Sequence, residues 1–329
     1  MDADPVTRRC LLGAALAVPG LAARAQTAVP EAAELMAPGP DEGLAAGFAA
    51  RAARGLARGL VQASALRVHV LGGPDGVTAA NRFAASTAPD GRLLLVLPGA
   101  ACQARMIGDS RARFDPGPWP AVTGSAAPAI VAGRAGPRGA PALRVALPGP
   151  ASPEAAALLA LEMQGRATTP VFLSGGVAPE AAVLAGAADA VVLTGRAVLV
   201  RAEALGLTPW FSLDGRDGTR DPAAPAVPGF GETVGPARPA LVAAVRAAGA
   251  ALRARGVLVL PALTSSDQVA LWRAAARRWG AEEAEAPETG ARRLAPEEAA
   301  ELLATLCPAP EAMLAYRQWL RQRLGYQAG

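Results

Sequence analysis

The chain has 329 residues, a length that allows two domains of ordinary size and a substantial core. Its formal net charge is +4, its basic residues are all arginines spread along the chain, and aromatic residues make up only 4%. A nucleic-acid surface needs clustered basic residues and stacking aromatics, so this composition argues against that class. His69 is the only histidine, which excludes a metal site built on several histidines.

The N-terminus has the pattern of an export signal. Arg8 and Arg9 precede an apolar run over residues 11–23, which ends at a small-residue cleavage motif. We predict that residues 1–25 are removed after Ala25 and that the protein is periplasmic. The paired arginines followed by leucine resemble the twin-arginine type of signal. A membrane anchor is the alternative, but the apolar run is too short to span a bilayer.

The first third of the mature chain predicts one α/β unit over residues 33–101. Expected strands and helices alternate in it, at residues 33–36, 44–60, 66–71, 77–87 and 93–97. Pro/Gly-rich loops at residues 37–43 and 98–101 follow two of the strands. Residues 105–122 are expected to be irregular.

A second α/β unit follows, and its loops predict an anion-accepting edge. Short apolar runs lie at residues 143–147, 170–173 and 190–193. The first two lead through Gly-containing turns into segments that begin with Pro and Glu, a helix-start signal. Such alternation makes a parallel sheet, and ligands bind where the strands end and helix N–H groups point.

The last third predicts mostly helices. They are expected from Arg196 to residue 205 and at residues 239–255, 266–279, 292–306 and 310–324, with a strand at residues 257–260. Residues 214–235 are too rich in Gly, Asp and Pro for a regular element. Cys102 and Cys307 leave two interpretations open, because their spacing does not show whether they form a disulfide or are two small buried side chains.

The order and spacing of these motifs resemble the substrate-binding proteins of tripartite tricarboxylate transporters, also called Bug receptors, over residues 33–280. The resemblance rests on short motifs at residues 37–43, 72–76, 87–91, 114–122, 147–152, 171–176, 186–189 and 260–264. It implies an α/β fold of the type II periplasmic binding protein kind: two lobes, each a mixed sheet flanked by helices, joined by a hinge. Lobe one would hold residues 26–122 and 256–329, and lobe two residues 123–255.

The resemblance also implies a function. We expect a receptor, not an enzyme, with no cofactor and no metal. It would close its lobes around a small organic carboxylate or a related metabolite. The protein would be a monomer that serves a tripartite tricarboxylate-type transporter, through its membrane subunits, or a sensing system.

The expected ligand-binding residues lie in four loops and one strand end. They are Pro38, Gly39, Pro40, Asp41, Gly99, Ala100, Gly149, Ala151, Ser152, Ser174, Gly175, Gly176 and Arg196. Backbone N–H groups would meet a carboxylate, and Arg196 would either add charge-assisted hydrogen bonds or be a solvated surface residue. Ser152 could cap the helix that follows it or reach the ligand.

One competing interpretation comes from another class. Residues 170–177 and 186–196 resemble the phosphate-binding end of a TIM barrel, which would imply an enzyme that uses a flavin or a phosphorylated substrate. In a barrel that motif lies near the end of the chain. More than a hundred residues follow it here, and they begin with a long irregular segment. We therefore favour the receptor.

Overall fold

The computed structural model describes residues 32–60, 65–85, 88–134, 142–213, 218, 220–235, 238–282 and 290–328. The expected export signal lies outside these residues. Within the described ranges, every helix is too short or too polar to cross a membrane.

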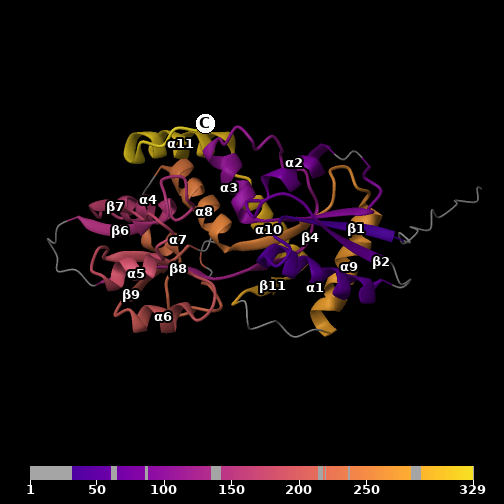
Figure 1. Cartoon of the computed structure of the whole chain (residues 1–329), viewed down its shortest axis with the longest axis horizontal. Coiled ribbons are helices and arrows are strands. Elements are labelled where there is room, and N and C mark those ends of the chain that lie inside the picture. Colours follow the sequence, from indigo (N-terminus) through magenta and orange to yellow (C-terminus); the bar gives the residue numbers. More distant parts are fainter. Residues whose placement is uncertain are drawn as a thin grey trace, which may run out of the picture.

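Two separate mixed sheets form the framework, the larger at the right and the smaller at the left of Figure 1. The larger has the order β11-β4-β10-β3-β1-β2, and the smaller β7-β6-β8-β5-β9. The strands of the larger sheet are β1 (Ala32–Ala37), β2 (Ala65–Val70), β3 (Leu93–Leu97), β4 (Ala121–Ala126), β10 (Ala254–Val259) and β11 (Arg292–Leu294). Those of the smaller are β5 (Ala129–Gly133), β6 (Leu143–Leu147), β7 (Thr168–Phe172), β8 (Ala190–Thr194) and β9 (Thr208–Ser212). The fold prediction is confirmed, and the TIM-barrel alternative is wrong, because neither sheet is an eight-stranded parallel barrel.

Helices cover both faces of the larger sheet. Its helices are α1 (Leu44–Gly59), α2 (Val77–Ala85), α3 (Gly99–Ile107), α9 (Ser266–Glu282) and α10 (Pro296–Leu306). One face is covered by α1 and α9, where Phe48 and Trp272 pack on Leu258. The other is covered by α2, α3 and α10, where Phe83 and Leu303 join the same core as Val257. Neighbouring residues of β10 thus face opposite cores, which explains its unbroken apolar sequence.

The smaller sheet is enclosed in the same way by α4 (Ala155–Met163), α5 (Pro179–Leu184) and α6 (Val198–Ala204). Residues of α4 from Ala155 to Leu161 are all buried. A helix that is apolar on every side must be covered on every side. The sheet covers one side of α4, and α8 (Pro239–Arg253) covers another.

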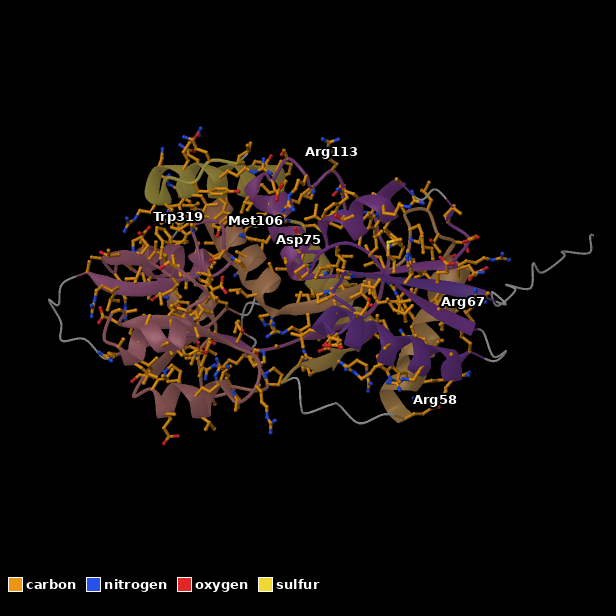
Figure 2. The ribbon with its side chains drawn as sticks, viewed as in Figure 1. Arg58, Arg67, Asp75, Met106, Arg113 and Trp319 are labelled. Atoms are coloured by element: carbon orange, nitrogen blue, oxygen red, sulfur yellow. The ribbon has the colours of Figure 1, made fainter. Side chains whose placement is uncertain are left out.

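The C-terminal helix α11 (Pro310–Leu324) contacts both halves of the molecule (Figure 2). Its Arg317 donates to the Met106 carbonyl of α3 at 2.8 Å. Its Trp319 Nε1 and Arg323 Nε donate to Glu162 of α4 at 3.0 and 2.6 Å. One continuous core also joins Met106 to Tyr316 and to the smaller sheet. The larger lobe is the half built on the larger sheet, which includes all of β4 and β10, and the smaller lobe is the half built on the smaller sheet; α11 links the two. The expected division at residues 122–123 and 255–256 stays a prediction.

Several expected elements differ in the structure. Residues 99–107 form α3, although residues 98–101 were expected to be a loop and residues 105–122 irregular; Pro98 precedes the helix and Gly99 begins it. β4 begins at Ala121, inside the segment expected to be irregular, and residues 292–294 are a strand where we expected the start of a helix. A short helix, α7 (Phe230–Thr233), lies in the segment where no regular element was expected.

Cys102 and Cys307 are both free thiols in this structure. Of the two interpretations of these cysteines, the structure therefore has two separate side chains and no disulfide between them. Burial raises the pKa of Cys102 well above its usual range and the pKa of Cys307 to about 11. We expect both thiols of the native mature protein to resist Ellman's reagent at pH 8 and to react once guanidinium unfolds the chain, because only the thiolate reacts.

The same shifts set a pH dependence. When a thiol has a higher pKa in the folded state than in the unfolded state, its contribution to the free energy of unfolding is fully present below the unfolded-state pKa. For Cys307 this contribution is lost as the pH rises from about 9 towards about 11. In the test with Ellman's reagent, two outcomes would contradict the assignment of two buried free thiols. One is a rapid reaction of the native protein, and the other is an unfolded chain that reacts only after a reductant is added.

Candidate functional site

The parallel strands of each sheet end at one edge of that sheet, and helix α3 of the larger lobe meets one of the strand-end loops of the smaller lobe. β1 pairs parallel to β2 and β3, and β6 pairs parallel to β7 and β8, so each set ends at one edge of its sheet. The two edges are in contact, because Gln103 Nε2 of α3 donates to the Ala151 carbonyl in the loop after β6 at 3.2 Å. Figure 1 shows α3 and α8 between the sheets.

The first expected loop contains a buried half and an exposed half. Pro38 and Gly39 are buried, whereas Pro40 and Asp41 are exposed. A Cβ on Gly39 would lie 2.5 Å from the Gly72 carbonyl oxygen, so only glycine fits where the loop passes the end of β2. Gly39 therefore positions this loop, and Asp41 lies on its solvent side.

The expected loop at residues 98–101 is the first turn of α3, and Gly99 is buried in it. A Cβ there would collide with the carbonyl of Ala251 on α8. Ala100 is exposed. The close contact between α3 and α8 is thus enough to explain why residue 99 is glycine, without any contact to a ligand.

The loop at residues 148–152 lies directly at the junction but uses Ser152 internally. Both the hydroxyl and the N–H of Ser152 donate to the Gly149 carbonyl, at 2.9 and 3.2 Å. No side chain caps α4, so the first alternative for Ser152, a helix cap, is wrong, and ligand contact stays a prediction. A Cβ on Gly149 would meet only open space. Among the described residues, none accepts the N–H groups of Gly149 and Ala151.

A buried polar cluster lies behind this loop. Gln103, Glu154 and Tyr316 come from α3, the start of α4 and α11. Each has one buried oxygen without a hydrogen-bond partner among the described residues. Burial raises the pKa of Glu154 and of Tyr316 above their usual values. Sequence analysis missed the cluster, because it interpreted Glu154 only as a helix-start residue.

The loop after β7 is open. Ser174, Gly175 and Gly176 are all exposed. The two glycines have φ values of 65° and 74°, and a Cβ on either would have no neighbour within 4 Å. Their left-handed backbone, which glycine adopts without strain, explains the pair. They remain candidates on the strength of their place at the sheet edge.

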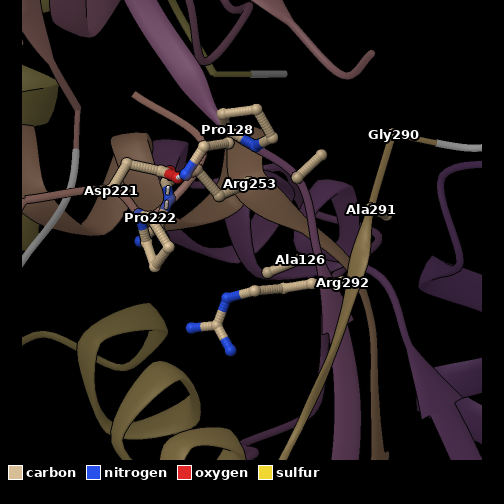
Figure 3. A pocket seen from close by; sticks show the side chains of 10 residues that line it. Ala126, Pro128, Asp221, Pro222, Arg253, Gly290, Ala291 and Arg292 are labelled. Atoms are coloured by element: carbon tan, nitrogen blue, oxygen red, sulfur yellow. Dashed lines mark hydrogen bonds and ion pairs between the residues drawn. The ribbon is translucent and has the colours of Figure 1, made fainter. Parts of the chain in front are cut away.

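Gly290, one of the residues that line a cavity at the hinge (Figure 3), contacts the turn after β8. Arg196 is exposed, and its backbone leaves no room for a Cβ on Gly290. The N–H of Gly195 donates to the Pro128 carbonyl at 3.1 Å. The cavity has a volume of about 330 Å³ and is lined by Ala126, Ala127, Pro128, Asp221, Pro222, Ala223, Arg253, Gly290, Ala291 and Arg292. Sequence analysis missed it, because its lining comes from four separate segments.

The charged groups of this cavity are paired. Arg253 Nη2 lies 3.5 Å from the Asp221 carboxylate, and the two side chains are only 10% and 6% exposed. Arg292 Nη2 lies 2.9 Å from Glu298. Across the described ranges, no three His, Cys, Asp or Glu side chains are grouped to hold a metal ion.

No protein-family model matches the chain, and no curated protein matches its sequence. Among solved structures, a TctC solute binding protein from Polaromonas, without ligand, matches with a TM-score of 0.65 at 16% identity; the match covers 88% of this chain and 98% of that one. The chain has the fold of a TctC solute-binding protein.

Two further structures share this TctC fold. An R. palustris protein solved with adipate has a TM-score of 0.52 at 15% identity and covers 90% of this chain and 98% of its own. The periplasmic binding protein BugD has a TM-score of 0.50 at 14% identity and covers 91% of this chain and 99% of its own. The near-complete coverage of all three means that the two-lobe architecture is shared as a whole.

Proposed function

We propose that this protein is an exported solute-binding receptor of the TctC and Bug kind, which captures a small organic carboxylate at the junction of its lobes. The observation that carries the proposal is the TctC fold, in which Gln103 of α3 in one lobe donates to the Ala151 carbonyl in a strand-end loop of the other. The adipate bound by one structural neighbour supports a carboxylate as the ligand class.

The proposed mechanism is binding without turnover. A ligand that touches loops of both lobes stabilises the closed arrangement relative to the open one, by the difference of its affinity for the two. Gly39, Gly149 and Ala151 would offer backbone N–H groups to the ligand. Delivery to a tripartite tricarboxylate-type transporter or to a sensor would follow in the periplasm, with export directed by the twin-arginine-like residues 1–25. The receptor would work as a monomer.

The test is a thermal-shift screen followed by calorimetric titration of the mature protein, residues 26–329. The probes are adipate, malate, citrate and benzoate, with adipamide as the uncharged match of adipate. We expect at least one carboxylate to bind with 1:1 stoichiometry and to raise the melting temperature, because a ligand at 100 times its Kd adds about 2.7 kcal/mol to stability. Adipamide should bind far more weakly than adipate. A screen in which no carboxylate binds, or in which one is chemically converted, would overturn the proposal.

A further inference from the structure

Three arginines lie at the hinge, and they differ in their partners. Arg253 pairs with Asp221 and Arg292 pairs with Glu298. The side chain of Arg255, at the start of β10, has neither a hydrogen bond nor an ion pair with any residue in the described ranges. The side chain is nevertheless half-buried, and burial lowers its pKa.

The local backbone explains how Arg255 comes to lie there. The register between β10 and β4 shifts between Ala254 and Gly256, so Arg255 is the extra residue of a β-bulge. Bulges redirect side chains and are frequent beside functional sites. Gly256 faces Val96 and Phe48 in the larger lobe, where a Cβ would lie 2.6 Å from Val96 Cγ1.

The guanidinium of Arg255 crosses to the other lobe. Its Nη2 lies 3.2 Å from the point where a Cβ on Gly195 would stand. Gly195 directly follows β8, has a φ of 87°, and donates its N–H to the carbonyl of Pro128, which lines the hinge cavity. The cation is therefore held between a strand of the larger lobe and a strand end of the smaller one, beside the cavity.

A half-buried charge without a counter-ion is costly for the ligand-free protein, because the charge has lost part of its hydration and gained no partner. An anion at the junction would offset that cost. A guanidinium is planar and donates two parallel hydrogen bonds, a geometry that matches a carboxylate.

We propose that Arg255 is the charged anchor for the carboxylate of the ligand. This inference rests on the proposed function and assigns to Arg255 the ligand contact that sequence analysis offered as one of two alternatives for Arg196. Arg196 is exposed and contributes its backbone to the contact with Gly290. Because Arg255 belongs to one lobe and touches the other, a carboxylate bound to it would link ligand capture to the closed arrangement.

The experiment compares R255Q with wild type and with R196Q as the matched control. Adipate, malate, citrate and benzoate are titrated calorimetrically into each protein. Each carboxylate that binds wild type should bind R255Q roughly 10- to 150-fold more weakly, the loss typical of a hydrogen-bonded charge. R196Q should keep its affinity within about twofold, and R255K, which keeps the charge but not the planar fork, should fall between.

A stability measurement separates this role from a structural one. Ligand-free R255Q should melt no lower than wild type, because the substitution removes an unpaired, half-buried charge. A lower melting temperature together with unchanged affinity would make Arg255 structural and overturn the inference. If R255Q binds as tightly as wild type, the anchor fails while the proposed function stands. If none of the four probes binds wild type, the proposed function fails and the inference fails with it.

Discussion

Gly99→Ala is expected to lower the free energy of unfolding by about 1–3 kcal/mol, although alanine normally favours a helix over glycine. Gly99 is the first residue of α3, and its added Cβ would collide with the backbone of Ala251 on α8. Backbone atoms cannot rotate away as a side chain can, so the two helices must separate. Since α8 lies between the lobes, the separation would disturb the junction as well.

The measurement is urea unfolding of Gly99→Ala beside Gly149→Ala. The two positions form a matched pair, because both glycines were expected in ligand loops. Around Gly149 there is space for a Cβ, and its φ is not left-handed, so Gly149→Ala should leave stability within about 0.5 kcal/mol of wild type. Equal stabilities of the two variants would show that α3 and α8 do not approach as closely as described.

Asp221→Ala is expected to destabilise the protein by about 3–5 kcal/mol, the loss typical of breaking a buried ion pair from one side. The side chains of Asp221 and Arg253 are 6% and 10% exposed, and the aspartate also accepts the Ala223 N–H at 2.9 Å. The substitution leaves the buried guanidinium without this carboxylate. It also releases the segment after β9 from the end of α8.

Chemical denaturation of Asp221→Ala, of Glu297→Ala and of the double variant Asp221→Ala/Arg253→Met checks this result. Glu297 pairs with Arg277 at 2.5 Å, but the Arg277 and Glu297 side chains are 56% and 63% exposed, so its loss should leave the unfolding midpoint unchanged. The double variant should recover part of the loss, because no buried charge is left there. An Asp221→Ala midpoint equal to that of Glu297→Ala would refute the importance of the buried pair.

The sequence predicted those elements whose local pattern matches their surroundings. β3 and β8 are short apolar runs bounded by turns, and both were expected within a residue of their bounds. α3 was missed because Pro98 and Gly99 are typical turn residues, and here the glycine is required by the approach of α8. The three residues of β11 are too few to show the alternation of a strand, and they lie just before helix α10, so the predicted helix was extended over them.

The candidate site was predicted less completely, for a physical reason. Loops that follow strands could be named from their Pro and Gly residues, and their place at the sheet edges follows from the fold. The hinge cavity and the position of Arg255 depend on which distant segments meet. A bulge at one residue of β10 turns that arginine towards Gly195, and nothing in the neighbouring residues marks it.

The contacts of α11 limit how the lobes can move. Arg317 holds this helix to α3, whereas Trp319 and Arg323 hold it to α4, on the far side of the junction. A wide rotation about the strand connections would have to pull one set of these contacts apart. The C-terminal helix therefore restrains how far the two lobes can separate on the side of the junction where it lies.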